Sequence, residues 1–201
     1  EKGDPNYDLF QLAMETSAKR LFPNFSFLDA PFNAQYYKEG NIHTEIAYMG
    51  CRTRVIGDVT SPDNQVVTGR GNLSWTTINL PRLGIKYGVA LKERNKADLK
   101  AFYAELEELM DKVKDQLLER FDIQKSLHVY NFPFLMGQGV WLGSDKLKPN
   151  DTIEGVIKHG TLGVGFIGLA ETLKALIGKH HAEDEEAQKL GIKIVSFMRE
   201  K

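Results

Sequence analysis

Residues 161–178, TLGVGFIGLAETLKALIG, join a predicted strand directly to a predicted helix, and this junction decides the fold class. Thr161–Ile167 has the composition of a strand interrupted by glycines, and Leu169–Ile177 follows as a helix that Gly178 ends. A second strand, in which apolar and polar residues alternate, is predicted over Leu73–Leu80 and ends at Pro81. Strands that alternate with helices predict an α/β protein.

The rest of the chain supplies further predicted elements of the same class. Apolar residues at helical spacing predict a long helix over Lys92–Phe121 and a shorter one that starts at Pro5 and ends before Pro23. Other predictions are short strands over Phe25–Leu28 and Leu127–Phe132, an extended run over Thr44–Met49, a polar loop over His180–Glu186 and a final helix after it.

Composition narrows the class of protein. The 201 residues are 42% hydrophobic and carry a formal net charge of −1, which favours one globular domain over residues 1–201 without a separate second domain. The near-neutral charge argues against nucleic-acid binding, and no apolar run reaches the roughly 18 residues of a membrane span.

A single cysteine and no export signal favour a cytoplasmic protein. Since the chain starts without Met and ends within a predicted helix, we expect a piece of a longer protein.

Cys51 is the only cysteine, and it lies between Gly50 and Arg52. It therefore has no disulfide partner in the chain, and a zinc site built from several cysteines is excluded. Three interpretations stay open from the residue type: a packed small hydrophobe, a thiol activated by the nearby charges of Arg52 and Arg54, and a thiol that carries a radical.

Asn72 follows a pair of glycines, Gly69 and Gly71, at the start of a predicted strand. Its amide offers both a donor and an acceptor to a substrate hydroxyl. The competing interpretation is an Asx-turn at the strand entry.

Two other patterns favour structural interpretations. Gly163–Gly168 matches the G-x-G-x-x-G spacing of dinucleotide sites, but its glycines lie inside the strand, which favours close packing instead. His180, His181 and Asp184 have the chemistry of metal ligands, yet a solvated loop after a helix is the favoured interpretation. Trp75 and Trp141 are expected in the core or an interface.

Six segments occur in an order that resembles the anaerobic, class III ribonucleoside-triphosphate reductases, a family of glycyl radical enzymes. They are Pro-Asn-Tyr-Asp-Leu at 5–9, Met-Gly-Cys-Arg-Thr at 49–53, Gly-Arg-Gly-Asn-Leu at 69–73, Thr-Ile-Asn-Leu-Pro-Arg at 77–82, Gly-Phe-Ile-Gly-Leu-Ala-Glu at 165–171 and Gly-Ile-Lys-Ile-Val at 191–195. Each segment is weak alone, but the ordered set is specific and covers nearly the whole chain.

The resemblance implies part of a ten-stranded α/β barrel with a finger loop inside it. Cys51 matches the loop-tip cysteine that becomes a thiyl radical, and Asn72 matches the active-site asparagine that follows it at a fixed spacing. The resemblance further implies substrate contacts at Met49, Gly50, Asn79 and Gly165, and no metal ligand within this chain.

The implied reaction reduces ribonucleoside triphosphates. A glycyl radical takes the hydrogen of Cys51, the thiyl takes the ribose 3′-hydrogen, the 2′-hydroxyl leaves as water, and formate or a thiol system supplies electrons. The implied parent enzyme is a homodimer with a structural zinc, and an S-adenosylmethionine and iron-sulfur activating protein generates its glycyl radical.

Several parts of the family's pattern have no counterpart in these 201 residues. They are the glycyl-radical loop, the four-cysteine zinc site, a second active-site cysteine, the phosphate-binding turn and the ATP-cone domain. We therefore expect the chain alone to be inactive. The alternatives are a piece of another glycyl radical enzyme and a non-catalytic α/β binding or assembly module in which Cys51 is packed.

Overall fold

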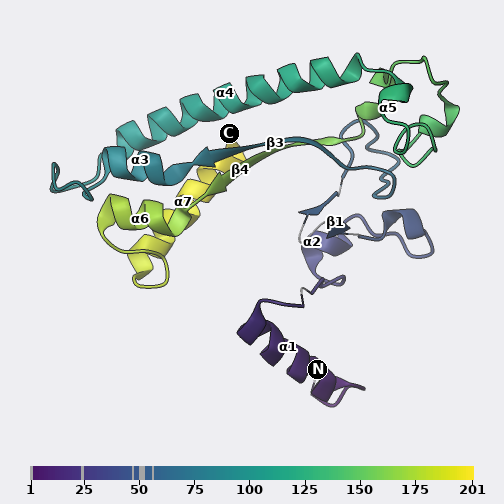
Figure 1. Cartoon of the computed structure of the whole chain (residues 1–201). Coiled ribbons are helices and arrows are strands. Elements are labelled where there is room, and N and C mark those ends of the chain that lie inside the picture. The colour runs from purple at the N-terminus through teal and green to yellow at the C-terminus, as the bar shows by residue number, and fades with distance from the viewer. Residues whose placement is uncertain (1, 24, 47, 50–52, 56) are drawn as a thin grey trace.

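The computed structural model describes residues 2–23, 25–46, 48–49, 53–55 and 57–201. Figure 1 shows the order of the elements along the chain. The helices are α1 (Tyr7–Arg20), α2 (Pro31–Ala34), α3 (Leu80–Tyr87), α4 (Leu99–Lys125), α5 (Glu154–Ile157), α6 (Leu169–Ile177) and α7 (Glu185–Glu200), with short 3₁₀ turns at Ile42–Thr44, Val129–Asn131 and Ser144–Lys146. The strands are β1 (Tyr48–Met49), β2 (Thr53–Arg54), β3 (Asn72–Asn79) and β4 (Thr161–Ile167).

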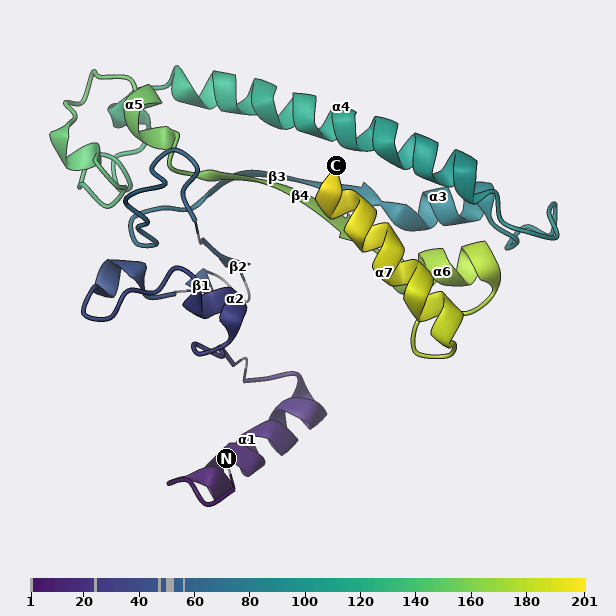
Figure 2. The same ribbon diagram turned by 180° about the vertical axis from the view of Figure 1, so that it is seen from behind.

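The parallel pair β3 and β4 is the centre of the molecule. Asn72 pairs with Thr161 at one end, and Asn79 pairs with Ile167 at the other. Figures 1 and 2 show α4 running along one side of this pair, with α6 and α7 on the opposite side. The α/β class and the strand and helix predicted over residues 161–177 are therefore confirmed.

The main hydrophobic core lies where α3, α4, α6 and α7 meet the end of β3. Phe102 and Leu106 of α4, Leu173 of α6 and Ile194 of α7 are fully buried in this core. Gly84 allows α3 to approach α6 closely, because a Cβ there would lie 2.9 Å from the carbonyl oxygen of Thr172. The helices therefore enclose one continuous apolar core around the sheet's end.

A second, smaller core lies beyond the far end of α4, and Trp141 anchors it. The Trp141 indole is buried, and its Nε1 donates a hydrogen bond to the carbonyl oxygen of Val156 at 2.9 Å. This confirms the expected core position of Trp141. The strand predicted over Leu127–Phe132 is wrong, because residues 129–131 form a 3₁₀ turn in which the Asn131 side chain accepts a hydrogen bond from the His128 amide.

At the starts of two helices, the local structure differs from what the sequence predicts. The predicted helix at Lys92 begins only at Leu99, where the Asp98 side chain accepts a hydrogen bond from the Ala101 amide. The strand predicted over Leu73–Leu80 ends already at Asn79, and Leu80 opens α3, in which Pro81 is the second residue, since proline suits the first turn of a helix. Helix α3 was not predicted from the sequence.

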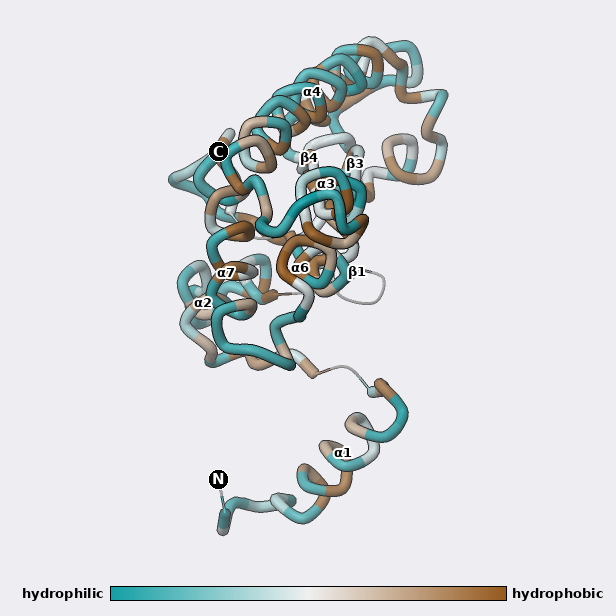
Figure 3. Tube along the Cα trace, turned by 90° about the vertical axis from the view of Figure 1, so that its left-hand side faces the viewer, coloured by the Kyte–Doolittle hydropathy of each residue, from teal (hydrophilic) through white to brown (hydrophobic). Residues whose placement is uncertain are grey.

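The N-terminal part is packed differently. Helix α1 matches its prediction, but it has no buried residue, and Figure 3 shows it apart from the other elements with apolar and polar residues interspersed. Among the described residues of 2–46, only Asn33 and Thr44 are buried. The strand predicted over Phe25–Leu28 is wrong: these residues form an irregular segment and a turn.

The described residues contain two sheets of two strands each, so a ten-stranded barrel is not observed in this part of the chain. No helix among the described residues is both long and apolar enough to cross a membrane.

Candidate functional site

Asn72, the predicted active-site asparagine, is the first residue of β3 and lies beside the first residue of β4. The Thr161 hydroxyl donates a hydrogen bond to Asn72 Oδ1 at 2.5 Å, and the Thr161 amide donates to the carbonyl oxygen of Gly71 at 3.0 Å. Asn72 is exposed. The amide therefore faces solvent at a strand end where a neighbouring side chain holds its oxygen.

A β-bulge follows Asn72 directly. Asn72 pairs with Thr161 and Ser74 pairs with Leu162, which leaves Leu73 as the extra residue of β3. The Leu73 carbonyl accepts a hydrogen bond from Gln124 of α4 at 3.2 Å, and its side chain covers Gly160, where a Cβ would lie 2.5 Å from Leu73 Cγ. Bulges redirect neighbouring side chains and occur often beside active sites. Here the bulge sets the direction of Asn72.

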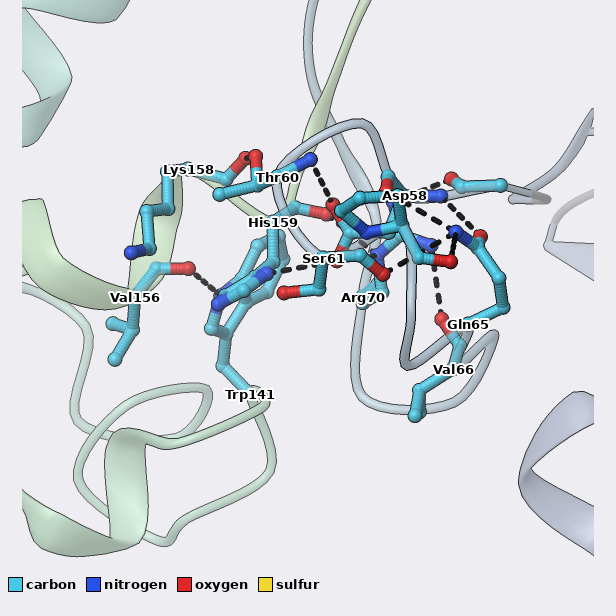
Figure 4. A network of polar contacts seen from close by, with 12 residues as sticks. Asp58, Thr60, Ser61, Gln65, Val66, Arg70, Trp141, Val156, Lys158 and His159 are labelled. Carbon is cyan, nitrogen blue, oxygen red and sulfur yellow. Dashed lines mark hydrogen bonds and ion pairs between the residues drawn. The ribbon is translucent and has the colours of Figure 1, made fainter.

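A buried polar network lies directly before both strands, and Figure 4 shows it in close view. Arg70 donates from Nε to the carbonyl oxygen of His159 at 2.7 Å, and its other nitrogens donate to the carbonyls of Val66 and Gly57 at 2.9 Å. His159 Nδ1 lies 2.8 Å from Asp58 Oδ2. Since Arg70 precedes β3 and His159 precedes β4, this network fixes the two strand starts to each other.

The electrostatics of the network favour an ionised Asp58. Burial raises the pKa of Asp58, but hydrogen bonds from His159 and the Thr60 amide and the charge of Arg70 lower it by more, so this pKa lies below its ordinary value. Burial lowers the pKa of Arg70, partly offset by the charge of Asp58. Since an ionised carboxylate only accepts, the hydrogen in the Asp58–His159 contact belongs to His159 Nδ1.

The predicted radical cysteine, Cys51, and its neighbour Gly50 lie outside the described residues. The flanking strands are described: Tyr48 pairs with Arg54 and Met49 pairs with Thr53, antiparallel. The described strands before and after Cys51 in the sequence are therefore paired with each other. The Arg54 guanidinium lies over the Phe32 ring, 4.7 Å from its centroid, and this cation–π contact stabilises its charge.

Gly165, a predicted substrate contact, lies inside β4 and has a packing reason to be glycine. A Cβ at Gly165 would come within 2.4 Å of Trp75 Nε1, and one at Gly163 within 2.2 Å of the same indole. The glycine pattern thus makes room for Trp75, which confirms the predicted close packing at these glycines. Trp75 itself is 53% exposed, so its outer face is not covered by the described residues.

Asn79, another predicted substrate contact, lies at the opposite end of β3 from Asn72. Seven residues of strand at about 3.3 Å each separate the two by roughly 23 Å. The Asn79 side chain caps α3 by accepting a hydrogen bond from the Arg82 amide at 3.3 Å. The structure therefore does not bring these two amides together. Substrate contacts at Met49, Gly50, Asn79 and Gly165 stay predictions.

Side chains in and around the loop that contains His180 and His181 form a helix cap and surface ion pairs. Asp184 accepts a hydrogen bond from the Ala187 amide at the start of α7, and it pairs with Lys179 at 3.1 Å. His180 Nε2 lies 3.3 Å from Glu183. Throughout the described part of the chain, no three His, Cys, Asp or Glu side chains are grouped to hold a metal ion. These contacts support the solvated-loop interpretation.

Thr161, Asp58, Arg70 and His159 were not identified as site residues from the sequence. Arg70 and His159 each precede a strand by two positions, and Thr161 opens a strand, but spacing alone cannot show that the strands are adjacent. Only the pairing of β3 with β4 brings these side chains together.

The chain is similar to known proteins over its whole length. The sequence profile of the anaerobic ribonucleoside-triphosphate reductase family matches residues 1–201. Proteins named anaerobic ribonucleoside-triphosphate reductase are similar to this chain in Haemophilus influenzae (32% identical over 99% of the chain), Escherichia coli (30% over 100%) and the phage T4 (30% over 89%). The chain spans about a quarter of the length of these relatives, between 26% and 28%.

Proposed function

Because the chain belongs to the anaerobic ribonucleoside-triphosphate reductase family, we propose that it supplies the radical cysteine and the substrate-orienting asparagine of such a reductase. The observation that carries this proposal is the family match over all 201 residues, which includes both Cys51 and Asn72. The substrate is a ribonucleoside triphosphate and the product is the 2′-deoxy form.

In the proposed reaction Cys51 gives up its thiol hydrogen, and the resulting sulfur radical takes the 3′-hydrogen of the ribose. The 2′-hydroxyl takes up a proton and leaves as water, and the two electrons come from formate, which becomes carbon dioxide, or from two thiols, which become a disulfide. The Cys51 thiol then returns the hydrogen to C3′, which restores the sulfur radical. Such a radical needs the reacting C–H bond held close in a site from which water is excluded. The Asn72 amide orients the ribose hydroxyls.

Two features support a finger loop and a larger barrel. The antiparallel pairing of β1 with β2, the described strands before and after Cys51 in the sequence, supports the proposal of a finger loop. Parallel sheets are normally covered on both faces, yet in this parallel pair Trp75 is 53% exposed and Phe166 is 38% exposed. We propose that β3 and β4 are neighbouring strands of a ten-stranded α/β barrel, with residues 1–201 as its central portion.

The proposed enzyme needs groups that these residues do not supply. It is a homodimer in which a glycyl radical, produced by a radical S-adenosylmethionine activating protein, starts the chemistry at Cys51. A four-cysteine zinc site does not fit residues 1–201, because Cys51 is their only cysteine. No step of the proposed reaction depends on zinc. Nucleic acid and membrane are not expected partners.

The test uses the active, anaerobically purified reductase that contains this chain. Cys51→Ser should abolish deoxynucleotide formation while the glycyl radical still appears in the electron paramagnetic resonance spectrum, because an O–H bond is too strong to relay the hydrogen atom. Asn72→Ala should lower kcat about ten- to a hundredfold, the loss of one orienting hydrogen bond. Asn64→Ala, which removes an exposed amide, is the matched control and should be unchanged. Near-normal turnover by Cys51→Ser would refute the proposed role.

A further inference from the structure

The Asn72 amide has two ends, and the structure determines which end is available to a ligand. Oδ1 accepts the hydrogen bond of the Thr161 hydroxyl at 2.5 Å. Among the described residues, no other side-chain hydrogen bond of Asn72 is found, so neither N–H group of Nδ2 is used by a described residue. The Thr161 hydroxyl can donate or accept, so the assignment of Nδ2 as the ligand-facing end follows from the orientation in which the structure places Oδ1 toward Thr161.

The backbone around this pair is held from three directions. The Thr161 amide donates to the Gly71 carbonyl at 3.0 Å, and Arg70 donates to the His159 carbonyl at 2.7 Å. The bulge at Leu73 is held by Gln124 of α4. A polar group held this way is preorganised, since it needs no rearrangement when a ligand arrives.

We propose that Thr161 is a positioning residue that fixes Asn72 as a hydrogen-bond donor toward a ribose hydroxyl oxygen. This inference rests on the proposed function. Within the described part of the chain, the hydrogen bond of the Thr161 hydroxyl goes to the Asn72 amide oxygen, so Thr161 acts on the substrate through Asn72. With Oδ1 occupied, Nδ2 offers its two N–H groups to the hydroxyl oxygen, which holds the ribose in one orientation for the reaction.

The experiment is a double-mutant cycle in the active reductase. Thr161→Val keeps the shape of the side chain and removes the hydroxyl. It should lower kcat about tenfold, with the KM for nucleotide within about twofold, and Thr161→Ser should recover most of the activity. In the Asn72→Ala background, Thr161→Val should cause no further loss, because Thr161 then has no amide to orient.

Two further variants sharpen the test. Thr76→Val removes a hydroxyl on the neighbouring strand β3 that bonds Gln116 at 2.9 Å instead, and it should leave kcat unchanged. Asn72→Asp can still accept from Thr161 but has no N–H to donate, so it should be as impaired as Asn72→Ala. The glycyl radical signal should be equal in every variant, which shows that each one folds.

The outcomes separate this inference from the proposed function. If the wild-type enzyme reduces nucleotides, Cys51→Ser is inactive, and Thr161→Val is as active as wild type, only the role of Thr161 is wrong. Equal losses from Thr161→Val with and without Asn72 would also overturn it, since they would show an independent structural effect. Activity of Asn72→Asp near that of wild type would overturn the donor assignment. An active Cys51→Ser enzyme would instead overturn the proposed function.

Discussion

Residues 72–201 and residues 2–46 are built from similar proportions of apolar residues but use them in opposite ways. In the first region α3, α4, α6 and α7 enclose Phe102, Leu173 and Ile194, which are fully buried. In the second, Leu12 is 60% exposed, Leu21 is 78% exposed, and the described residues bury no apolar side chain.

The difference shows that a sequence can favour a helix locally even where no tertiary packing stabilises that helix. Helix α1 forms where the sequence predicts it, yet it buries none of its residues. An isolated helix of this length is marginally stable in water. We therefore expect the region from β3 to α7 to unfold as a cooperative unit and α1 to fray independently.

The largest effect should come from emptying the main core. Phe102→Ala removes a fully buried ring of α4 and should lower the free energy of unfolding by about 3–5 kcal/mol. Leu12→Ala in α1 is the control and should change it by less than about 0.5 kcal/mol. Urea unfolding followed by circular dichroism measures both. Similar losses for the two variants would show that α1 is part of the same cooperative unit.

A smaller effect is expected at the segment that joins the two regions, where Asp58, Arg70 and His159 form their buried network. Asp58→Asn removes the charge that Arg70 and His159 contact, and it should cost about 1.5–3 kcal/mol near pH 7. Asp63→Asn, an exposed carboxylate in the same loop, is the matched control and should have no effect.

The cost of Asp58→Asn should depend on pH. The pKa of Asp58 is lowered in the folded protein, so its stabilising contribution is complete above the unfolded pKa of about 3.9 and is lost as the pH falls through the lower folded value. The difference between wild type and Asp58→Asn should thus persist at pH 5 and shrink below about pH 4. A difference that stays constant down to pH 2 would mean that the Asp58 charge is not what stabilises the fold.

The smallest effect on the free energy of unfolding should come from replacing one helical alanine by glycine, a substitution that can be made in both α4 and α1. Ala104→Gly on the exposed face of α4 should lower the free energy of global unfolding by about 1 kcal/mol. Ala13→Gly in α1 should leave it unchanged, because α1 is already open when the rest unfolds. Hydrogen exchange read by mass spectrometry should show α4 amides protected and α1 amides exchanging rapidly. If the amides of α1 were as well protected as those of α4, α1 would belong to the same cooperative unit.

The sequence determined the elements whose limits are set by local chemistry. Gly178 ends α6, and the β4 strand spans the predicted residues, because a glycine end cap and a run of extended residues are properties of adjacent positions. Leu127–Phe132 had similar apolar residues, but a local hydrogen bond from the His128 amide to Asn131 formed a turn instead. The resemblance also predicted the family, which the profile match shows, and an active-site role for Asn72, which stays a prediction.

Only the tertiary structure decided what Asn72 touches. Thr161 is far from Asn72 in sequence, and so is His159 from Asp58; they meet because β3 pairs with β4 in one parallel register. The role of the β4 glycines likewise depends on the tertiary structure, because they leave room for the Trp75 indole that packs against them. Contacts between distant positions depend on strand register and on side-chain volume in three dimensions, and neither quantity is encoded in the spacing of residues along one chain.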